Sequence, residues 1–372
     1  MRVLMLGSKE YPFQSGAGFE KKPSGGIEVH VEKLTKYLAK DNYDVIILTR
    51  KFPGQKEYEK KGKIKAYRVG FINSPLLRGP SFNIISFFRA FSVIKKERPD
   101  IIHAHAPMAG FFGAVLSKMF RTPMVYTPHG TSKAYNPIFN LVLDALNRVA
   151  AIGASKTLFI SSEARKEMVS KYRPFDNALL TNGIDADDFD LSSKRDWKEL
   201  RFVFIGRLEE IKGAYDMVCA FQKLAGEFKK VRLSIVGSGS EEDRLKKYVA
   251  ENELDDLVTF SGWSKKPLKH LAQNDVYVLP SCETGLPISL IEAKFARKII
   301  ITSLPYIVDG KDGLYFKAGD VDALYLKMKD VAENFSRRVE LGKEAQKSVE
   351  KLSWDKIVKG FEKEYGMVVA ND

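Results

Sequence analysis

The fold of this chain is decided by three segments, which read FVFIGRLEEIKG (202–213), SIVGSGS (234–240) and VYVLPSCETGLPISLIE (276–292). Each runs from the end of a short apolar strand through a glycine turn into a helical stretch. In a parallel sheet such turns meet at the carboxyl edge, where the free amides of helix N-termini favour anions. The segments therefore predict a site for a nucleotide diphosphate at that edge.

Short apolar runs alternate with helical stretches along the whole chain. They cover residues 3–6, 45–49, 101–104, 124–127, 157–161 and 178–180 in the first half, and 202–205, 233–236, 258–261, 276–279, 299–302 and 314–316 in the second. Continuous apolar strands of this kind are typical of parallel sheets covered on both faces. The sequence therefore predicts an α/β fold with two Rossmann-like, doubly wound parallel-sheet domains.

The predicted join between the domains lies near residues 191–199, after an acidic stretch that begins with Asn182-Gly183-Ile184-Asp185. We expect an N-terminal domain over residues 1–190 and a C-terminal domain over residues 200–353. The amphipathic stretch over residues 354–372 follows Ser353, a residue type favoured at helix N-caps. We expect this helix to pack back on the N-terminal domain.

Length and composition set the class of protein. The 372 residues fit two domains, and 44% hydrophobic with 29% charged residues is typical of a folded, soluble chain. No targeting peptide and no membrane-spanning run is recognisable, so we expect a cytoplasmic protein. Two cysteines and five histidines predict neither a disulfide framework nor a metal-rich active site.

The positive charge is concentrated in the first half of the chain. Residues 1–200 carry 32 Lys and Arg against 20 Asp and Glu, a surplus of 12, whereas residues 201–372 carry 28 against 27. Such a surface is either simply solvated or binds an anionic substrate, an anionic membrane or nucleic acid. Nucleic acid is disfavoured because no known reading module is present. The aromatic and basic segment over residues 82–96 packs on the sheet or, if exposed, favours peripheral contact with anionic lipid.

Arg207 and Lys212 are the candidate ligands of the diphosphate. Both lie near the predicted start of a helix, where a cation opposes the helix dipole by about 0.3 to 1 kcal/mol unless an anion lies between them. The alternative is a pair of solvent-facing cations that Glu209 and Glu210 partly neutralise.

The segment from Glu283 to Glu292 is the most specific of the three. It predicts a glycine loop and a helix bracketed by carboxylates, which can accept hydrogen bonds from the hydroxyls of a ribose or a hexose. The alternative is a helix that carries an acid at each end by chance. The turn at Gly237 and Gly239 is a weaker signal, which gains value from lying one strand after Arg207.

These motifs resemble those of the retaining, nucleotide-sugar-dependent glycosyltransferases of family 4, which have two Rossmann-like domains facing across a cleft (GT-B). The resemblance covers essentially the whole chain. It implies that Arg207 and Lys212 hold the donor diphosphate, that Glu292 binds the ribose, and that Glu283 acts near the sugar. The other donor-binding residues that it implies are Gly206, Gly237, Gly239, Thr284, Gly285 and Leu286.

The resemblance extends to motifs in the first half. Gly25-Gly26-Ile27-Glu28 matches a glycine pair before a helix, and His103-Ala104-His105 matches a His-x-His strand end, so Gly25, Gly26 and His105 are implied in acceptor or phosphate binding. Thr127-Pro128-His129-Gly130 matches a motif whose histidine faces the transferred sugar. Without the resemblance, a histidine at a strand end is more often structural. The connection from Ser8 to Ser24 is a candidate acceptor loop.

Two departures from the family pattern stand out. The family places its first glutamate eight residues before the second, whereas position 284 is threonine here and Glu283 stands nine before Glu292. Either a local bulge lets Glu283 reach the sugar or that contact is missing. The loop after residues 299–302 is short, and Phe295-Ala296-Arg297-Lys298 lacks the usual glycine.

The resemblance implies transfer of a hexose from a nucleotide diphosphate sugar to a hydroxyl acceptor, with retention and without a metal or other cofactor. The basic first half adds an anionic or lipid-linked acceptor at the inner face of the membrane as a hypothesis. Two other functions stay open: a catalytically silent sugar-nucleotide-binding subunit, and a sugar-nucleotide epimerase of the same fold.

Overall fold

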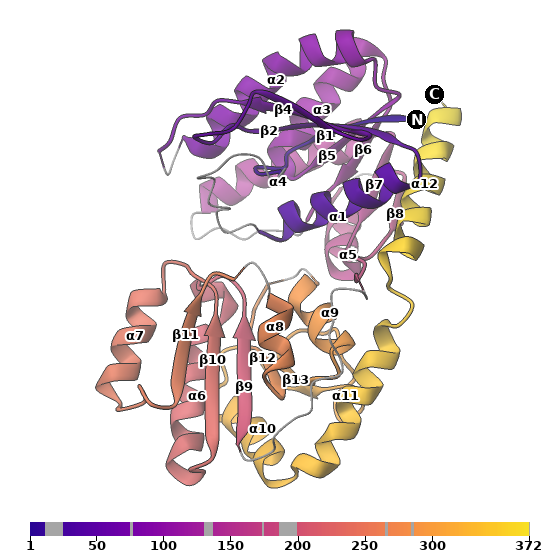
Figure 1. The fold of residues 1–372 in the computed structure, drawn as a ribbon. Coiled ribbons are helices and arrows are strands. Elements are labelled where there is room, and N and C mark those ends of the chain that lie inside the picture. The colour runs from indigo at the N-terminus through magenta and orange to yellow at the C-terminus, as the bar shows by residue number, and fades with distance from the viewer. Residues whose placement is uncertain are drawn as a thin grey trace. The chain divides into compact units, whose positions relative to one another are not determined.

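The computed structural model describes residues 1–11, 25–74, 77–129, 137–172, 175–185, 199–264, 267–283 and 286–371. The chain divides into two compact units (Figure 1). Unit 1 comprises Met1–Gly183 and Trp354–Asp372, and unit 2 comprises Ile184–Ser353. The division falls at Gly183, and most of the predicted join at 191–199 lies outside the described residues.

Unit 1 is built on an eight-stranded sheet in the order β3-β4-β2-β1-β5-β6-β7-β8. All neighbouring strands are parallel except β3 and β4, which form an antiparallel pair at one edge. The strands are β1 (Arg2–Leu6), β2 (Asp44–Arg50), β3 (Tyr58–Lys61), β4 (Ile64–Val69), β5 (Ile101–His105), β6 (Met124–Thr127), β7 (Lys156–Phe159) and β8 (Asn177–Leu179).

Helices cover both faces of this sheet because successive side chains of each strand point to opposite faces. In β1, Val3 and Met5 pack with α1 and α12, whereas Leu4 and Leu6 pack with α2 and α3 on the other face. The helices of unit 1 are α1 (Gly26–Lys40), α2 (Arg78–Glu97), α3 (Pro107–Phe120), α4 (Pro137–Gly153), α5 (Ser162–Lys171) and α12 (Trp354–Ala370). The last helix of the chain is thus part of the core of unit 1.

Unit 2 contains a six-stranded parallel sheet in the order β11-β10-β9-β12-β13-β14. Its strands are β9 (Leu200–Ile205), β10 (Val231–Val236), β11 (Val258–Gly262), β12 (Val276–Leu279), β13 (Ile299–Thr302) and β14 (Leu314–Tyr315). Its helices are the 3-10 turn η2 (Glu210–Lys212) and α6 (Ala214–Glu227), α7 (Glu242–Glu251), α8 (Pro267–Ala272), α9 (Ile288–Phe295), α10 (Val321–Glu333) and α11 (Phe335–Val349). The central position of β9 and β12 places the turns that follow them side by side.

The predicted α/β fold with two parallel sheets is confirmed, and the twelve predicted strands all occur. The prediction missed β3 and β4, the hairpin at the edge of sheet 1. The segment over residues 82–96 lies in α2, where Phe82 is buried and Phe88 is exposed. Within the part of the chain that the structure describes, none of the helices combines the length and the apolar character needed to cross a bilayer.

Candidate active site

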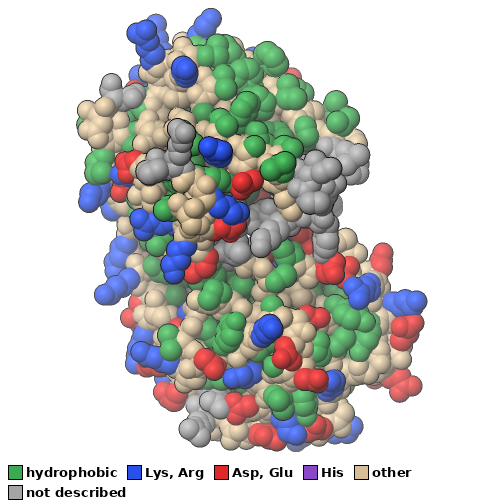
Figure 2. All heavy atoms as spheres, turned by 180° about the vertical axis from the view of Figure 1, so that it is seen from behind, with side chains coloured by type: hydrophobic (Ala, Val, Ile, Leu, Met, Phe, Trp, Pro, Cys, Tyr) green, Lys and Arg blue, Asp and Glu red, His purple; other side chains and the backbone are tan. Residues whose placement is uncertain are grey.

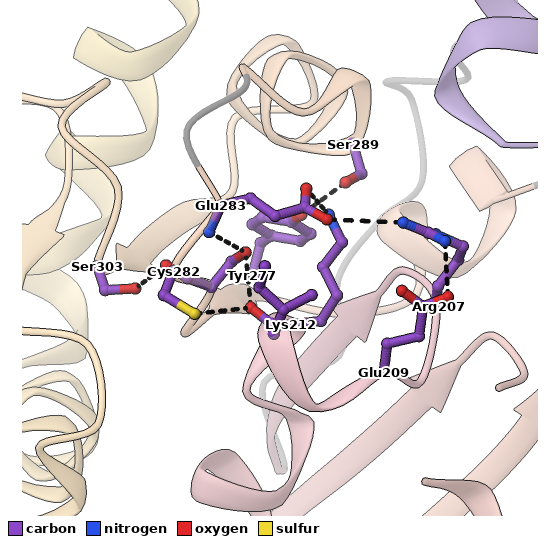
Figure 3. Close-up of polar contacts among 10 residues, drawn as sticks. Arg207, Glu209, Lys212, Tyr277, Cys282, Glu283, Ser289 and Ser303 are labelled. Atoms are coloured by element: carbon purple, nitrogen blue, oxygen red, sulfur yellow. Dashed lines mark hydrogen bonds and ion pairs between the residues drawn. The ribbon is translucent and has the colours of Figure 1, made fainter. Parts of the chain in front are cut away.

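Three charged side chains meet at the carboxyl edge of the unit 2 sheet (Figure 3). Arg207 follows β9, Lys212 ends η2, and Glu283 follows β12. The Nζ atom of Lys212 lies 2.5 Å from Oε2 of Glu283, and Nη2 of Arg207 lies 3.6 Å from Oε1 of the same carboxylate. Arg207 also pairs with Glu209 at 2.6 Å. The carboxylate of Glu283 therefore lies between the two cations that the sequence assigned to a diphosphate.

Backbone contacts hold the two loops against each other. The amide of Cys282 donates a hydrogen bond of 3.0 Å to the carbonyl oxygen of Ile211, and the Ser281 hydroxyl donates one of 3.2 Å to the same oxygen. On the other side, the hydroxyl of Ser303 donates to the carbonyl oxygen of Ser281 at 2.7 Å. These contacts fix the residues next to Lys212 and Glu283, so the approach of the two side chains follows from the backbone.

Two glycines permit the close approach of these turns. Gly213 has a φ of +70°, and a Cβ atom there would lie 2.1 Å from the carbonyl oxygen of Pro280. Gly237 has a φ of +149°, and its Cβ atom would lie 1.8 Å from the carbonyl oxygen of Gly206. Glycine alone tolerates this combination of left-handed backbone and contact.

The two cations differ in exposure, which gives them different roles. The Lys212 side chain is only 11% exposed, whereas that of Arg207 is 57% exposed. A nearly buried ammonium needs an anionic partner, because desolvation without one is costly. Lys212 is therefore bound to an anion in any folded state, either Glu283 or a ligand that replaces it, while Arg207 can turn toward solvent.

The helix α9 adds hydroxyl and carboxylate groups beside this pair. The hydroxyl of buried Tyr277 on β12 lies 2.8 Å from that of Ser289 on α9 (Figure 3). Burial raises the pKa of Tyr277, and the charge of Glu292, half-buried on the same helix, raises it further. Tyr277 is therefore a neutral hydroxyl, and Glu292 lies near enough to act on it electrostatically.

Unit 1 brings four histidines together at the end of its central strands. His103 and His105 lie on β5, His129 follows β6, and His30 lies on α1. Nδ1 of His105 lies 3.0 Å from Nε2 of His129, and the ring centroids of His30 and His129 are 4.9 Å apart.

Two of these imidazoles have fixed orientations. His30 donates from Nδ1 to Oδ1 of Asn182 at 2.6 Å, and His103 lies between the hydroxyls of Tyr365 (2.6 Å) and Thr127 (2.8 Å). The Nε2 atoms of His30 and His105 are buried and have no hydrogen-bond partner among the described residues.

Burial keeps these imidazoles neutral. It lowers the pKa of His30 from 6.5 to about 4, although the bond to Asn182 acts in the opposite direction, and it lowers the pKa of His103, His105 and His129 well below 6.5. Ring nitrogens of His30, His105 and His129 lie within 4.8 Å of one another. Neutral imidazoles at such spacing can donate hydrogen bonds to ligand oxygens, and these three could also hold a transition metal.

Comparison with known proteins identifies the family. Residues 24–188 match the model of Glycosyltransferase Family 4, and residues 186–348 match that of Glycosyl transferases group 1. An uncharacterized glycosyltransferase, MJ1069, of Methanocaldococcus jannaschii is 26% identical over 93% of this chain and 95% of its own length. The chain belongs to the GT-B glycosyltransferases of the family 4 type. The two matched models meet at residues 186–188, just beyond the division between the two units.

Solved structures of low sequence identity share the fold of this glycosyltransferase. Sucrose-phosphate synthase from Thermosynechococcus elongatus has a TM-score of 0.85 at 20% identity, with all of both chains covered. HepE from Anabaena, in complex with UDP-glucose, has a TM-score of 0.78 at 16% identity over 99% of this chain and 100% of its own.

The structure brings most of the predicted donor residues of the glycosyltransferase together. The amide of Gly206 donates to the carbonyl oxygen of Val236 at 3.1 Å, which places the Gly237 and Gly239 turn beside Arg207. Leu286 is half-buried and packs in the core of unit 2. Thr284 and Gly285 lie outside the described residues.

The motifs that the resemblance implies in acceptor or phosphate binding fall in unit 1. Gly25 precedes α1, which begins at Gly26, and the amide of Gly25 donates to Glu28 at 3.0 Å. His105 and His129 contact each other. Gly130 and most of the candidate acceptor loop, residues 12–24, lie outside the described residues.

The structure shows the surroundings of one residue from each departure from the family pattern. Glu283 faces Lys212 and Arg207 although it stands nine residues before Glu292. Arg297, in the segment that lacks the usual glycine, has a φ of +56° and donates to Gln346 at 2.6 Å. A left-handed residue that is not glycine costs about 1 to 2 kcal/mol, and this hydrogen bond offsets part of that cost.

Sequence reasoning missed His30, Asn182, Tyr277 and Ser289 as site residues. Asn182 was seen only as part of an interdomain motif. His30 stands four residues after Gly26, one turn into the predicted helix, so helical spacing placed it near the glycine pair and was a usable signal. Tyr277 lies within an apolar strand, where nothing distinguishes it from a core residue.

Replacing Gly213 with alanine should destabilise the protein by at least about 2 kcal/mol, because the left-handed backbone and the contact with Pro280 both oppose a Cβ atom. Denaturant unfolding measures the change. Gly226→Ala is the matched control, since an added Cβ meets nothing within 4 Å there. It should be neutral or stabilise α6. Equal stability of the two variants would contradict the role of Gly213.

Acid should destabilise unit 1 through its histidines. The unfolded imidazole titrates near 6.5 and folded His30 near 4, so the unfolded state binds more protons between these values. The contribution of neutral, buried His30 to the free energy of unfolding is present above pH 6.5 and is lost as the pH falls toward 4. Melting temperatures across this range should fall less steeply for His30→Gln than for the wild type.

His270→Gln in unit 2 is the comparison for this measurement. Burial and the charge of Lys269 also lower the pKa of His270, but this side chain is partly exposed, so its replacement should flatten the slope less than His30→Gln does. A slope unchanged in His30→Gln would mean that His30 is protonated in the folded protein.

Proposed function

We propose that this glycosyltransferase moves a hexose from a nucleoside diphosphate sugar to an acceptor hydroxyl, with retention of configuration and without a divalent metal. The observation that carries the proposal is the convergence of Arg207 and Lys212 on one carboxylate at the carboxyl edge of the unit 2 sheet. The UDP-glucose bound to HepE, which shares the fold, supports a nucleotide sugar as the donor.

The chemistry requires charge stabilisation on the leaving group. As the bond between the anomeric carbon and the diphosphate oxygen breaks, negative charge grows on that oxygen. Lys212 and Arg207 supply positive charge beside it without a metal. The proposal assigns the imidazoles of His30, His105 and His129 no role as metal ligands in this step.

Glu283 acts as the internal anion of the site before the donor binds. It neutralises Lys212, and a diphosphate must displace it from there because the two anions compete for one ammonium. The displaced carboxylate remains on the same loop, within reach of the sugar hydroxyls. This exchange reconciles the position of Glu283 with a role near the sugar.

Retention follows in this proposal from attack on the face that the diphosphate leaves. The acceptor oxygen forms the new bond to the anomeric carbon, and its proton passes to the departing diphosphate oxygen. No dedicated carboxylate base is then needed. His129 is proposed to contact the transferred sugar as a neutral hydrogen-bonding group, in line with its lowered pKa.

The acceptor is proposed to be anionic or lipid-linked and to be used in the cytoplasm at the inner face of the membrane. Unit 1 carries 32 Lys and Arg against 18 Asp and Glu, a surplus of 14, while unit 2 carries 28 against 29. A surplus confined to the acceptor unit raises the local concentration of anionic acceptors.

Lys212→Ala should lower transfer from UDP-glucose, or from the sugar nucleotide that most raises the melting temperature, by at least about a hundredfold. Release of the nucleoside diphosphate in the presence of EDTA is the readout. Lys223→Ala removes an exposed lysine of unit 2 and should leave the rate unchanged. Wild-type turnover in Lys212→Ala would rule out the assignment, and complete loss of activity in EDTA would rule out the metal-independent mechanism.

Glu283→Gln should bind UDP more tightly than the wild type, because the competing carboxylate has lost its charge, while transferring sugar more slowly. Isothermal titration with UDP and the transfer assay separate the two effects. If UDP binding weakens instead, Glu283 positions the cations and does not compete for them.

A catalytically silent binding subunit is the second candidate, favoured by the neutralised state of Lys212. It predicts UDP-glucose binding without hydrolysis or transfer. Turnover of any donor by the purified chain would eliminate it, and interconversion of sugar nucleotides without an acceptor would instead indicate an epimerase.

A further inference from the structure

Three helices of unit 1 turn apolar side chains toward solvent. α3 packs between α2 and α4, and the ring of Phe112 on α3 lies tilted against that of Phe87 on α2 at a centroid distance of 5.0 Å. Phe88 of α2 is 68% exposed and Leu141 of α4 is 72% exposed. The other exposed apolar residues of these helices are Ile84, Ile85, Met119, Val142, Val149 and Ile152. Figure 2 shows hydrophobic side chains gathered over this part of the molecule, with Lys and Arg at the edge.

The exposed apolar residues of α4 follow helical spacing. Leu141, Val142, Val149 and Ile152 fall on one stripe, at intervals of one, seven and three residues. A helix at the surface of a globular unit normally presents polar residues on its outer stripe. Contiguous apolar surface of this kind marks a contact with a membrane or another protein.

The helices that carry this apolar face are rich in exposed cations. Helices α2, α3 and α4 with their C-cap residues contain eight Lys and Arg but two acids, Glu97 and Asp144. Glu97 is buried and pairs with Lys65, and Asp144 accepts a hydrogen bond from Tyr172. The exposed cations are Arg78, Arg89, Lys95, Lys96, Arg98, Lys118, Arg121 and Arg148. On α2, Lys95 stands seven residues after Phe88, which places it on the same side of the helix, and Arg89 lies next to Phe88 in the sequence, about 100° around the helix.

We propose that the α2–α4 face docks this glycosyltransferase on an anionic lipid bilayer. Apolar side chains enter the interface between headgroups and acyl chains, and the surrounding cations meet lipid phosphates. A second copy of the chain fits the face less well, because two faces of equal positive charge repel each other. The biological reason for docking rests on the proposed function, in which the acceptor is lipid-linked. Binding to the bilayer itself requires neither donor nor acceptor.

The test is cosedimentation of the full chain with vesicles of phosphatidylglycerol and phosphatidylcholine, compared with phosphatidylcholine alone. The wild type should sediment only with the anionic vesicles, and added salt should weaken binding because it screens the cations. Absence of binding to anionic vesicles, or equal binding to both, would overturn the proposal.

Variants locate the contact on the molecule. Phe88→Ser with Leu141→Ser should weaken partitioning at least about tenfold, and Arg89→Gln and Lys95→Gln on the order of fivefold each. Leu326→Ser and Lys343→Gln change exposed residues of unit 2 and should bind as the wild type does. Equal weakening by the unit 2 variants would show that the face is not the contact.

Two measurements keep this test separate from that of the proposed function. UDP-glucose binding by the Phe88→Ser and Leu141→Ser variant should match the wild type, which shows that its fold is intact and that donor binding is independent of docking. Sedimentation velocity without vesicles should give a monomer, whereas a dimer that this variant dissociates would assign the face to self-association and overturn the proposal.

Discussion

The position of the Glu283 carboxylate between Lys212 and Arg207 follows from one constraint of the fold. β9 and β12 are neighbours in a parallel sheet, so the turns that follow them leave the same edge and must pack against each other. The bond from the Cys282 amide to the Ile211 carbonyl oxygen joins them, and Gly213 gives the room for it. The chemistry of unit 2 rests on this contact between two loops that lie about seventy residues apart in the sequence.

Unit 1 uses a similar order of parallel strands to position neutral side chains instead of charged ones. Its strand β5 ends in His105 and His129 follows β6, and the surrounding core removes water from both side chains, so the imidazoles stay neutral. In the proposed mechanism, one unit provides fixed charge for an anionic leaving group and the other provides uncharged hydrogen-bonding groups. This division fits a reaction in which charge grows on one substrate only.

The amino-acid sequence was sufficient to predict the strands whose two faces are both buried. Strands such as β12 and β13 are continuous apolar runs, and their predicted bounds agree with the structure. The β3–β4 hairpin was missed because β3, with the sequence YEKK, is an exposed edge strand whose charged residues give no apolar signal. Charged residues at an edge also prevent further strands from pairing there.

Side-chain geometry was less predictable than topology. The spacing of Glu283 and Glu292 left open whether Glu283 reaches the site, because residue counts do not determine how a loop bends. The contact with Lys212 depends on hydrogen bonds between loops, which no local pattern encodes. Arg297 is a similar case, since its left-handed backbone is held by Gln346, forty-nine residues later.

The position of α12 has a consequence for how the molecule is made. Trp354, Phe361 and Tyr365 complete the core under α1, and Tyr365 supplies the hydroxyl beside His103. The ribosome synthesises these residues after all of unit 2. Unit 2 can therefore finish folding during translation. The face of the unit 1 sheet that α12 covers stays exposed until α12 leaves the ribosome. Translation that stopped before Trp354 would yield a folded unit 2 joined to a unit 1 with an incomplete core.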